Sequence, residues 1–247
     1  MRRLAVPLDG LCVRVKYAAN AAGISGLDHQ GVLAKTPSMV AGQVVLLNGV
    51  SSSGKSSISN ELQEMLSGPF LKASIDTFTP MLPERLIAID PPPGDPADQG
   101  MRVEIHDSPS GRSLILRPGA VFHRFARGMH RAVAAMAREG NDIIFDDVIY
   151  DPAYFQSYLD AFEEISVWFV GVNVPLDVAE RREQQRGDRA LGHARGHFEL
   201  VHRHGPYDIE VDTEAHSARE CAEQIVSAMN ALGEPSAFAG RRSQREI

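Results

Sequence analysis

Short runs of aliphatic and β-branched residues alternate along the chain with segments whose apolar residues recur every three or four positions. Residues 44–47 (Val-Val-Leu-Leu) form the first run, which is typical of a strand buried in a parallel sheet. The next apolar residues share one face of a predicted helix: Ile58, Leu62, Met65 and Leu66. Four further segments have the character of strands: 71–75, 143–145, 165–172 and 208–211. The pattern predicts an α/β fold with a five-stranded parallel sheet between two layers of helices.

Prolines and capping residues place further helices between these strands. Proline at the first helical position, or a serine cap, predicts helix starts near Pro152, Pro175 and Ser217. The longest predicted helix is 121–138, and its expected inner side carries Phe122, Phe125, Met129, Val133 and Met136. Residues 101–105 and 113–117 flank a turn at 107–111, which predicts a small β-hairpin insertion with a longer loop.

The two ends of the chain differ from this central region. Residues 1–40 mix Gly, Ala and isolated apolar residues without a sustained period, so we expect a poorly ordered N-terminal extension without a chemical role. After residue 233, Pro235 and Gly240 predict a disordered tail (234–247). The predicted folded domain is therefore 41–233.

Residues 49–56 (Gly-Val-Ser-Ser-Ser-Gly-Lys-Ser) match the phosphate-binding pattern G-x-x-x-x-G-K-[ST] in full. A glycine-rich turn between a strand and a helix N-terminus points several backbone N–H groups at one spot, which suits a polyphosphate. Lys55 is expected to reach the β- and γ-phosphates, and the Ser56 hydroxyl to hold Mg²⁺. The alternative is a chance match in a serine-rich turn, but the flanking strand and helix favour a loop that binds ATP. The residues expected to contact the nucleotide are Gly49, Val50, Ser51, Ser52, Ser53, Gly54, Lys55, Ser56, Ser57 and Arg182.

Composition and metal-ligand spacing argue against several other classes. The formal net charge of −7 argues against binding to nucleic acid or to an anionic membrane, because both require a broad basic surface. The two cysteines, Cys12 and Cys221, are far apart and outside any metal-ligand spacing, which fits a reducing cytoplasm. No apolar run approaches transmembrane length, so the expected location is the cytoplasm. His193 and His197 have the spacing of metal ligands without a third partner, so we expect them to supply polarity at the surface or in a lid.

Three aspartates are expected at the carboxyl edge of the sheet, where ligands bind. Asp76 follows the second strand and is predicted to accept a proton from an attacking hydroxyl, although Asp-Thr before a short helix is also good N-cap chemistry. Asp146 and Asp147 follow the strand at 143–145, the pattern of an acidic residue that organises Mg²⁺ through water. Adjacent ionised carboxylates favour a nearby cation. The sequence leaves open which of the two serves the metal.

An arginine-rich segment is the next candidate. Arg182 and Arg186 are four residues apart and share one helix face, which Gly187 is expected to end. Arg189 follows in a predicted arginine lid, whose guanidinium groups could clamp the oxygens of a transferring phosphoryl group. The alternative is a solvated charged face.

Six separated motifs, together with the hairpin, resemble the chloramphenicol phosphotransferase family, a branch of the P-loop small-molecule kinases. The matching segments are 47–56 (Leu-Asn-Gly-Val-Ser-Ser-Ser-Gly-Lys-Ser), 74–78 (Ser-Ile-Asp-Thr-Phe), 143–148 (Ile-Ile-Phe-Asp-Asp-Val), 168–172 (Trp-Phe-Val-Gly-Val), 186–189 (Arg-Gly-Asp-Arg) and 207–213 (Tyr-Asp-Ile-Glu-Val-Asp-Thr). The resemblance implies a three-layer P-loop kinase sandwich that transfers phosphate from ATP, with Mg²⁺, to a hydroxyl group. It also implies that Asp76 is the general base, that Arg186 and Arg189 are lid arginines, and that Lys55 and Ser56 hold phosphate and metal.

The leading prediction is an ATP-dependent O-phosphotransferase that acts on a small hydroxylated molecule. Its specific form is chloramphenicol 3-O-phosphotransferase, which would confer antibiotic resistance. The alternatives are a nucleotide, nucleotide-sugar or shikimate-like kinase of the same architecture, or a non-catalytic nucleotide-binding regulator. An anionic acceptor would need arginines on the acceptor side, and few lie outside the lid: Arg102, Arg112, Arg117 and Arg124. The sequence names neither the acceptor nor the oligomeric state, and a homo-oligomer remains open.

Overall fold

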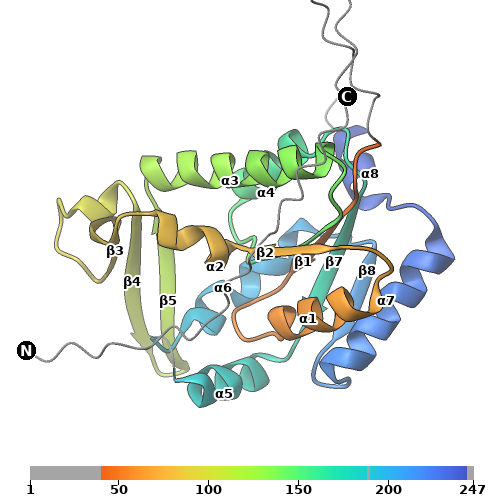
Figure 1. The fold of residues 1–247 in the computed structure, drawn as a ribbon. Coiled ribbons are helices and arrows are strands. Elements are labelled where there is room, and N and C mark those ends of the chain that lie inside the picture. The colour runs from red at the N-terminus through yellow and green to blue at the C-terminus, as the bar shows by residue number, and fades with distance from the viewer. Residues whose placement is uncertain (1–39, 188–189, 244–247) are drawn as a thin grey trace, which may run out of the picture. The chain divides into compact units, whose positions relative to one another are not determined.

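A five-stranded parallel sheet lies at the centre of the computed structural model, which describes residues 40–187 and 190–243, with side chains up to residue 241. The strand order is β2-β6-β1-β7-β8, and each strand pairs in parallel with its neighbours (Figure 1). The strands are β1 (Val44–Asn48), β2 (Leu71–Ser74), β6 (Ile143–Asp147), β7 (Val167–Asn173) and β8 (Ile209–Asp212). Each overlaps one predicted run, so the expected sheet is confirmed. The predicted N-terminal extension, apart from residue 40, lies outside the described residues.

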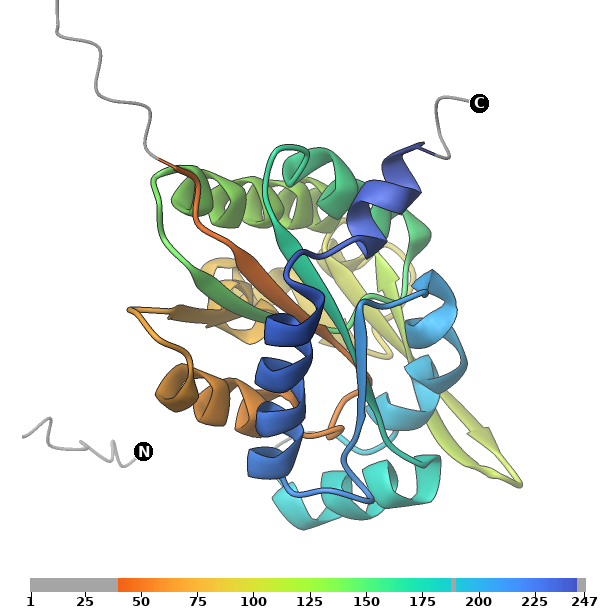
Figure 2. The same cartoon turned by 90° about the vertical axis from the view of Figure 1, so that its right-hand side faces the viewer.

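Helices cover both faces of this sheet because consecutive residues of a strand point to opposite sides. The helices of the two outer layers are α1 (Lys55–Met65), α7 (Ala218–Leu232), α3 (Ala120–Arg138) and α4 (Pro152–Ala161). On β1, Val45 and Leu47 belong to the apolar cluster of α1 and α7, whereas Val44 and Leu46 belong to that of α3 and α4. Figure 2 shows α1 and α7 on one side of the sheet and α3 and α4 on the other. The predicted three-layer sandwich is therefore confirmed.

A second, smaller sheet has the order β3-β4-β5. Its strands are β3 (Ile87–Ile89), β4 (Met101–Ser108) and β5 (Gly111–Pro118). β4 and β5 form the predicted hairpin, but Ser108 pairs with Gly111, so the loop is two residues long and shorter than expected. β3 pairs in parallel with β4 and was not predicted, because three residues are too few to show a pattern.

The remaining helices complete the fold. They are α2 (Ile75–Phe78), α5 (Leu176–Arg186), α6 (His193–Val201), α8 (Ala237–Ser243) and four 3₁₀ turns at Thr79–Met81, Glu84–Leu86, Pro96–Asp98 and His202–His204. The predicted helix starts are confirmed, since α4 begins at Pro152, Pro175 precedes α5 and Ser217 caps α7. Met136 was assigned wrongly to the inner side of α3, because its side chain is 40% exposed. None of the helices that the structure describes is long and apolar enough to cross a bilayer.

The C-terminal segment corrects the prediction of a disordered tail. Helix α8 forms where disorder was expected, and its Ala237 and Phe238 are 8% and 3% exposed. The Phe238 ring lies 5.4 Å from that of Phe169, centroid to centroid. Asp208 fixes the start of the helix, because its Oδ1 accepts hydrogen bonds from the backbone N–H groups of Ser236 (2.7 Å) and Ala237 (2.8 Å). Residues 244–247 lie outside the described part of the chain.

Candidate active site

The loop between β1 and α1 has the conformation of a phosphate-binding turn. At Gly49, a Cβ atom would lie 2.6 Å from the carbonyl oxygen of Val172, so only glycine fits. Ser52 (φ 62°) and Gly54 (φ 97°) adopt left-handed conformations, which turn successive backbone N–H groups inward. Helix α1 begins directly after this turn, at Lys55. The loop and the helix N-terminus therefore form a favourable site for an anion.

Lys55 is held against the loop that precedes it. Its Nζ donates hydrogen bonds to the carbonyl oxygens of Gly49 (2.7 Å) and Val50 (2.8 Å). The side chain is only 7% exposed. The ammonium group thus lies at the base of the loop, where a phosphate bound by the turn would meet a positive charge.

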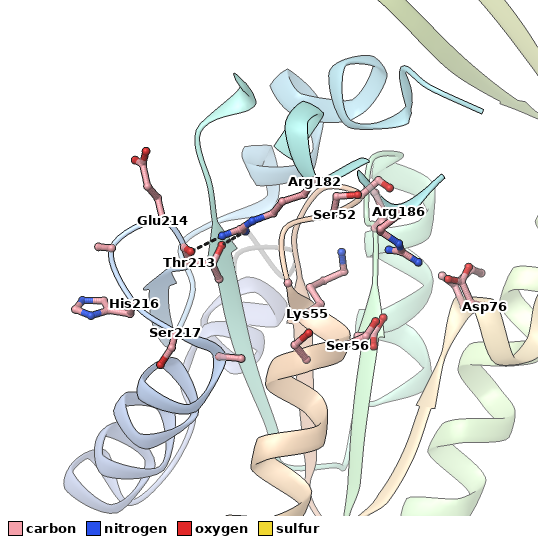
Figure 3. Close-up of a pocket in the computed structure, with 18 residues that line it drawn as sticks. Ser52, Lys55, Ser56, Asp76, Arg182, Arg186, Thr213, Glu214, His216 and Ser217 are labelled. Atoms are coloured by element: carbon pink, nitrogen blue, oxygen red, sulfur yellow. Dashed lines mark hydrogen bonds between the residues drawn. The ribbon is translucent and has the colours of Figure 1, made fainter. Parts of the chain in front are cut away.

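A cavity of about 730 Å³ opens in front of this loop (Figure 3). Ten of the residues singled out from the sequence line it: Ser51, Ser52, Gly54, Lys55, Ser56, Ser57, Asp76, Asp146, Arg182 and Arg186. In Figure 3, the side chains of Lys55, Arg186 and Asp76 extend toward the same part of the cavity. Gly49, Val50 and Ser53 contribute to the loop without lining the cavity, and Arg189 lies outside the described residues. We call this space the phosphate-side cavity.

Two residues of this site were missed as individual candidates, although both lie in family motifs. Thr213 follows β8, and its carbonyl and hydroxyl oxygens accept hydrogen bonds from the Arg182 guanidinium (2.6 and 2.9 Å). Its hydroxyl donates to the carbonyl of Ser53 at 2.8 Å and so ties β8 to the loop. Asn48, fully buried at the end of β1, accepts from the backbone N–H of Ile149 (2.9 Å) and so links the ends of β1 and β6. The sequence held a signal for Asn48, because it is a polar residue that ends the apolar run 44–47 directly before the loop.

The adjacent carboxylates on β6 face different environments. Asp146 lines the phosphate-side cavity, and burial raises its pKa despite the opposing charge of Lys55. Asp147 does not line that cavity. It accepts hydrogen bonds from the Tyr158 hydroxyl (2.5 Å) and the Val148 N–H (2.7 Å), and burial raises its pKa to about 6. Of the two, only Asp146 lines the phosphate-side cavity, although the charge of Lys55 acts on both carboxyl groups.

Asp76 lies in the first turn of α2, directly after β2. The cap of this helix is Ser74, whose side chain accepts from the Thr77 N–H at 3.2 Å, so Asp76 is not the N-cap. Asp76 lines the phosphate-side cavity and also a second cavity. Ser51, Ile75 and Val148 line both as well, so these four residues mark where the two spaces meet.

The second cavity has a volume of about 290 Å³ and a largely apolar wall. β3, β4, β5 and α3 supply nine of the residues that line it, among them Val103, Leu116, Phe122 and Met129. No lysine or arginine among the described residues lines it. We call this space the apolar cavity.

His197, on α6, also lines the apolar cavity. Its side chain is 3% exposed, so the expectation that it supplies polarity at the surface is wrong. The reason is that α6 packs against β5, where the Leu114 N–H donates to the Gly192 carbonyl at 2.9 Å. This packing turns one face of α6 toward the interior.

The residues near the loop fit a magnesium ion that is held mainly by phosphate oxygens and water. Among the described residues, no group of three or more His, Cys, Asp or Glu side chains could hold a metal alone. Asp146 interacts with the Ser56 hydroxyl and with the Ser59 hydroxyl, the latter at 3.4 Å. A single hydroxyl and one carboxylate are the usual protein contribution when Mg²⁺ binds together with a nucleotide.

The phosphate loop, the parallel sheet and the paired cavities define a P-loop small-molecule kinase, and solved kinase structures share this fold. The Mycobacterium tuberculosis APS kinase CysC in complex with AMPPNP and APS aligns with a TM-score of 0.52 and 17% identity, over 77% of this chain and 98% of that one. An unliganded sugar kinase from Janibacter sp. HTCC2649 aligns with a TM-score of 0.52 and 18% identity, over 80% of this chain and 98% of that one.

The family model described as chloramphenicol phosphotransferase-like protein matches residues 42–230, and the chain belongs to this family. Relatives from two M. tuberculosis strains, CDC 1551 / Oshkosh and H37Rv, bear the names "Putative O-phosphotransferase MT2714" and "Putative O-phosphotransferase Rv2636". Each is 31% identical over 212 residues, which cover 83% of this chain and 90% of the relative. The protein is accordingly an ATP-using phosphotransferase with a small-molecule acceptor.

Proposed function

We propose that this enzyme transfers the γ-phosphate of ATP to a hydroxyl of an uncharged, largely apolar small molecule, with chloramphenicol as the first acceptor to test. The observation that carries the proposal is the meeting of the two cavities at Asp76. A nucleotide in one cavity and an alcohol in the other would bring the phosphate and the attacking hydroxyl together beside one carboxylate.

The phosphate-side cavity would hold the nucleotide. Backbone N–H groups of the loop and the N-terminus of α1 bind the phosphates, and Lys55 neutralises charge at the β- and γ-positions. Ser56 and Asp146 would hold Mg²⁺, and Asp147 is left without a metal role in this proposal. When bound, the ion offsets charge on the phosphate oxygens.

The transfer step would rely on Asp76 and on arginines at the end of α5. Asp76 accepts the proton of the acceptor hydroxyl as its oxygen bonds to phosphorus and the bond to the ADP oxygen breaks. Arg186 lines the cavity and would stabilise the transferring group. Arg189, which lies outside the described residues, is proposed for the same role on its family motif. Arg182 supports the nucleotide through its bonds to Thr213.

The wall of the acceptor side argues against an anionic substrate and hence against the nucleotide and shikimate-like alternatives. Such substrates need cationic partners, and none of the four arginines named from the sequence lines the apolar cavity. Three of them are paired with carboxylates: Arg102 with Asp98, Arg112 with Asp107 and Arg117 with Glu104. A neutral acceptor therefore fits best, and phosphorylation of an antibiotic alcohol would make the activity one of resistance.

The test incubates the wild-type enzyme and an Asp76→Asn variant with chloramphenicol, ATP and Mg²⁺, and measures the phosphorylated product by mass. Asn keeps the side-chain shape but cannot take the proton, so turnover should fall by about 10²- to 10⁴-fold while ATP binds as before. Asp177→Asn, which removes an exposed carboxylate on α5, is the matched control. Efficient transfer to an anionic sugar or nucleotide, without transfer to chloramphenicol, would refute the proposed acceptor class. Wild-type turnover in the Asp76→Asn variant would refute the role of the base.

A further inference from the structure

Buried polar atoms without a partner gather at the two cavities. Among the described residues, eight buried side-chain nitrogen or oxygen atoms have no hydrogen-bond partner. Three are hydroxyls of the phosphate loop and four belong to residues that line the apolar cavity. Of these four, the hydroxyls of Tyr150 and Tyr154 interact with each other, which leaves His130 Nε2 and His197 Nε2. A buried polar atom without a partner is costly, and such atoms concentrate where a ligand supplies the missing bond.

His197 is the most informative of these residues, because its proton can be placed. Its Nδ1 lies 3.0 Å from the carbonyl oxygen of His193. A carbonyl oxygen only accepts hydrogen bonds, so Nδ1 carries the proton and donates it. Burial lowers the pKa of His197 to about 4, so the ring is neutral at pH 7. Nε2 then has a free lone pair and can only accept.

The other polar atoms of the wall are less directional. The Tyr150 ring lies 4.6 Å from the His197 ring, centroid to centroid, and its hydroxyl can either donate or accept. His130 shares a hydrogen bond of 2.8 Å with the Ser157 hydroxyl, in which either group can donate. His197 Nε2 is therefore the one atom of this set with a fixed requirement: it needs a donor from the ligand.

We propose that His197 Nε2 accepts a hydrogen bond from the acceptor molecule, so that the apolar cavity selects an uncharged apolar alcohol with a second donor, either a hydroxyl or an amide N–H. The proposal rests on the assignment of the apolar cavity to the acceptor. His197 does not line the phosphate-side cavity, so the donor is a different group from the hydroxyl that reacts beside Asp76. His197 is in this view a specificity-determining residue and not the base.

The test uses pairs of neutral alcohols that differ in one donor. One pair is N-acetylphenylalaninol and its N-methylated analogue, which lacks the amide N–H. The other is chloramphenicol and the analogue in which its benzylic hydroxyl is converted to an O-methyl ether. Equilibrium dialysis measures binding without ATP, and product mass measures kcat/KM with ATP and Mg²⁺. In the wild-type enzyme, at least one pair should show a preference of about 10- to 100-fold for the member that keeps the donor, since the other leaves Nε2 unpaired.

Variants then assign that preference to His197. His197→Phe and His197→Leu remove the acceptor atom with different side-chain volumes, and each should reduce the preference to about threefold or less. His197→Gln places an oxygen that can accept and should restore part of it. His106→Phe, on the exposed end of the hairpin, is the matched control and should keep the wild-type preference.

The results separate this inference from the proposed function. The role of His197 is supported if the donor preference in binding disappears in the Phe or Leu variant, even when no phosphorylated product forms. The missing product would then count against the proposed function alone. Absence of a donor preference in the wild-type enzyme for both pairs overturns the inference. A preference that persists in a folded Phe or Leu variant overturns it as well.

Discussion

Replacing Asp147 by asparagine should change how the stability of the enzyme depends on pH. The carboxyl group is buried, and burial raises its pKa from 3.8 to about 6 in the folded protein despite the hydrogen bonds from Tyr158 and Val148. The folded state therefore holds this proton more tightly than the unfolded state. The stabilisation from this group is complete below pH 4 and is lost as the pH rises through 6.

The size of the effect follows from the shift. A difference of about two pKa units corresponds to about 3 kcal/mol, about half of which is lost between pH 5 and pH 7.5. Asparagine is neutral throughout this range and retains the hydrogen-bonding geometry, because its oxygen can accept from the Val148 N–H and its nitrogen can donate to the Tyr158 oxygen. The variant should accordingly gain stability relative to the wild-type protein as the pH rises.

Urea unfolding at pH 5 and pH 7.5 measures this change as the difference in free energy of unfolding between the two proteins. Titration of the buried histidines is common to both proteins and cancels in the difference. Asp177→Asn on the exposed side of α5 serves as the control. Should Asp147→Asn shift the free energy by the same amount at both pH values, the carboxyl would titrate alike in the folded and unfolded states and the argument from burial would fail.

Three further substitutions test the packing of α6, α3 and α8. Gly196→Ala would place a Cβ atom 2.0 Å from the Leu114 carbonyl oxygen, so it should push α6 from β5, cost about 1–3 kcal/mol and raise the KM of the acceptor more than that of ATP. Gly128→Ala has open space around the new Cβ and should instead stabilise α3 by about 0.5–1 kcal/mol. Urea unfolding measures the stability changes of both variants, and steady-state kinetics measures the KM values. Phe238→Ala should cost about 3 kcal/mol in the same unfolding assay, because α8 packs on the core; a loss below about 0.5 kcal/mol would mean that the tail is dispensable, as its sequence suggested.

The sequence predicts those parts of the fold whose physics is local. Runs such as 44–47 and 143–145 are apolar on both faces because the strands are covered by helices on both sides, and this is visible without any knowledge of tertiary contacts. The phosphate loop is equally local, since its glycines serve the geometry of a single turn. The start of α7 at Ser217 depends on a capping box within four residues.

The errors concern features that only tertiary packing decides. Among its described side chains, helix α8 has two buried apolar residues, Ala237 and Phe238. Two residues are too few to show a helical period, and the nearby Pro235 and Gly240 favour a loop. The inward face of α6 depends on a close approach to β5 that leaves no room for a side chain at residue 196. The sequence could not predict the different surroundings of Asp146 and Asp147, because two adjacent residues do not show which cavity lies on each side of their strand.

If the phosphate-side cavity holds ATP and the apolar cavity holds the acceptor, as proposed, that separation on β6 makes the two binding sites independently adjustable. Asp146 and Asp147 line different cavities because neighbouring residues of a strand face opposite ways. A protein engineer can rebuild the walls contributed by α3, β4 and α6 to accommodate another alcohol and leave the loop, α1 and α5 untouched. A one-residue insertion in β6, in contrast, would exchange the two carboxylates and impair both sites together. The length of β6 must therefore stay fixed, whereas the residues that line the apolar cavity can change and with them the choice of acceptor.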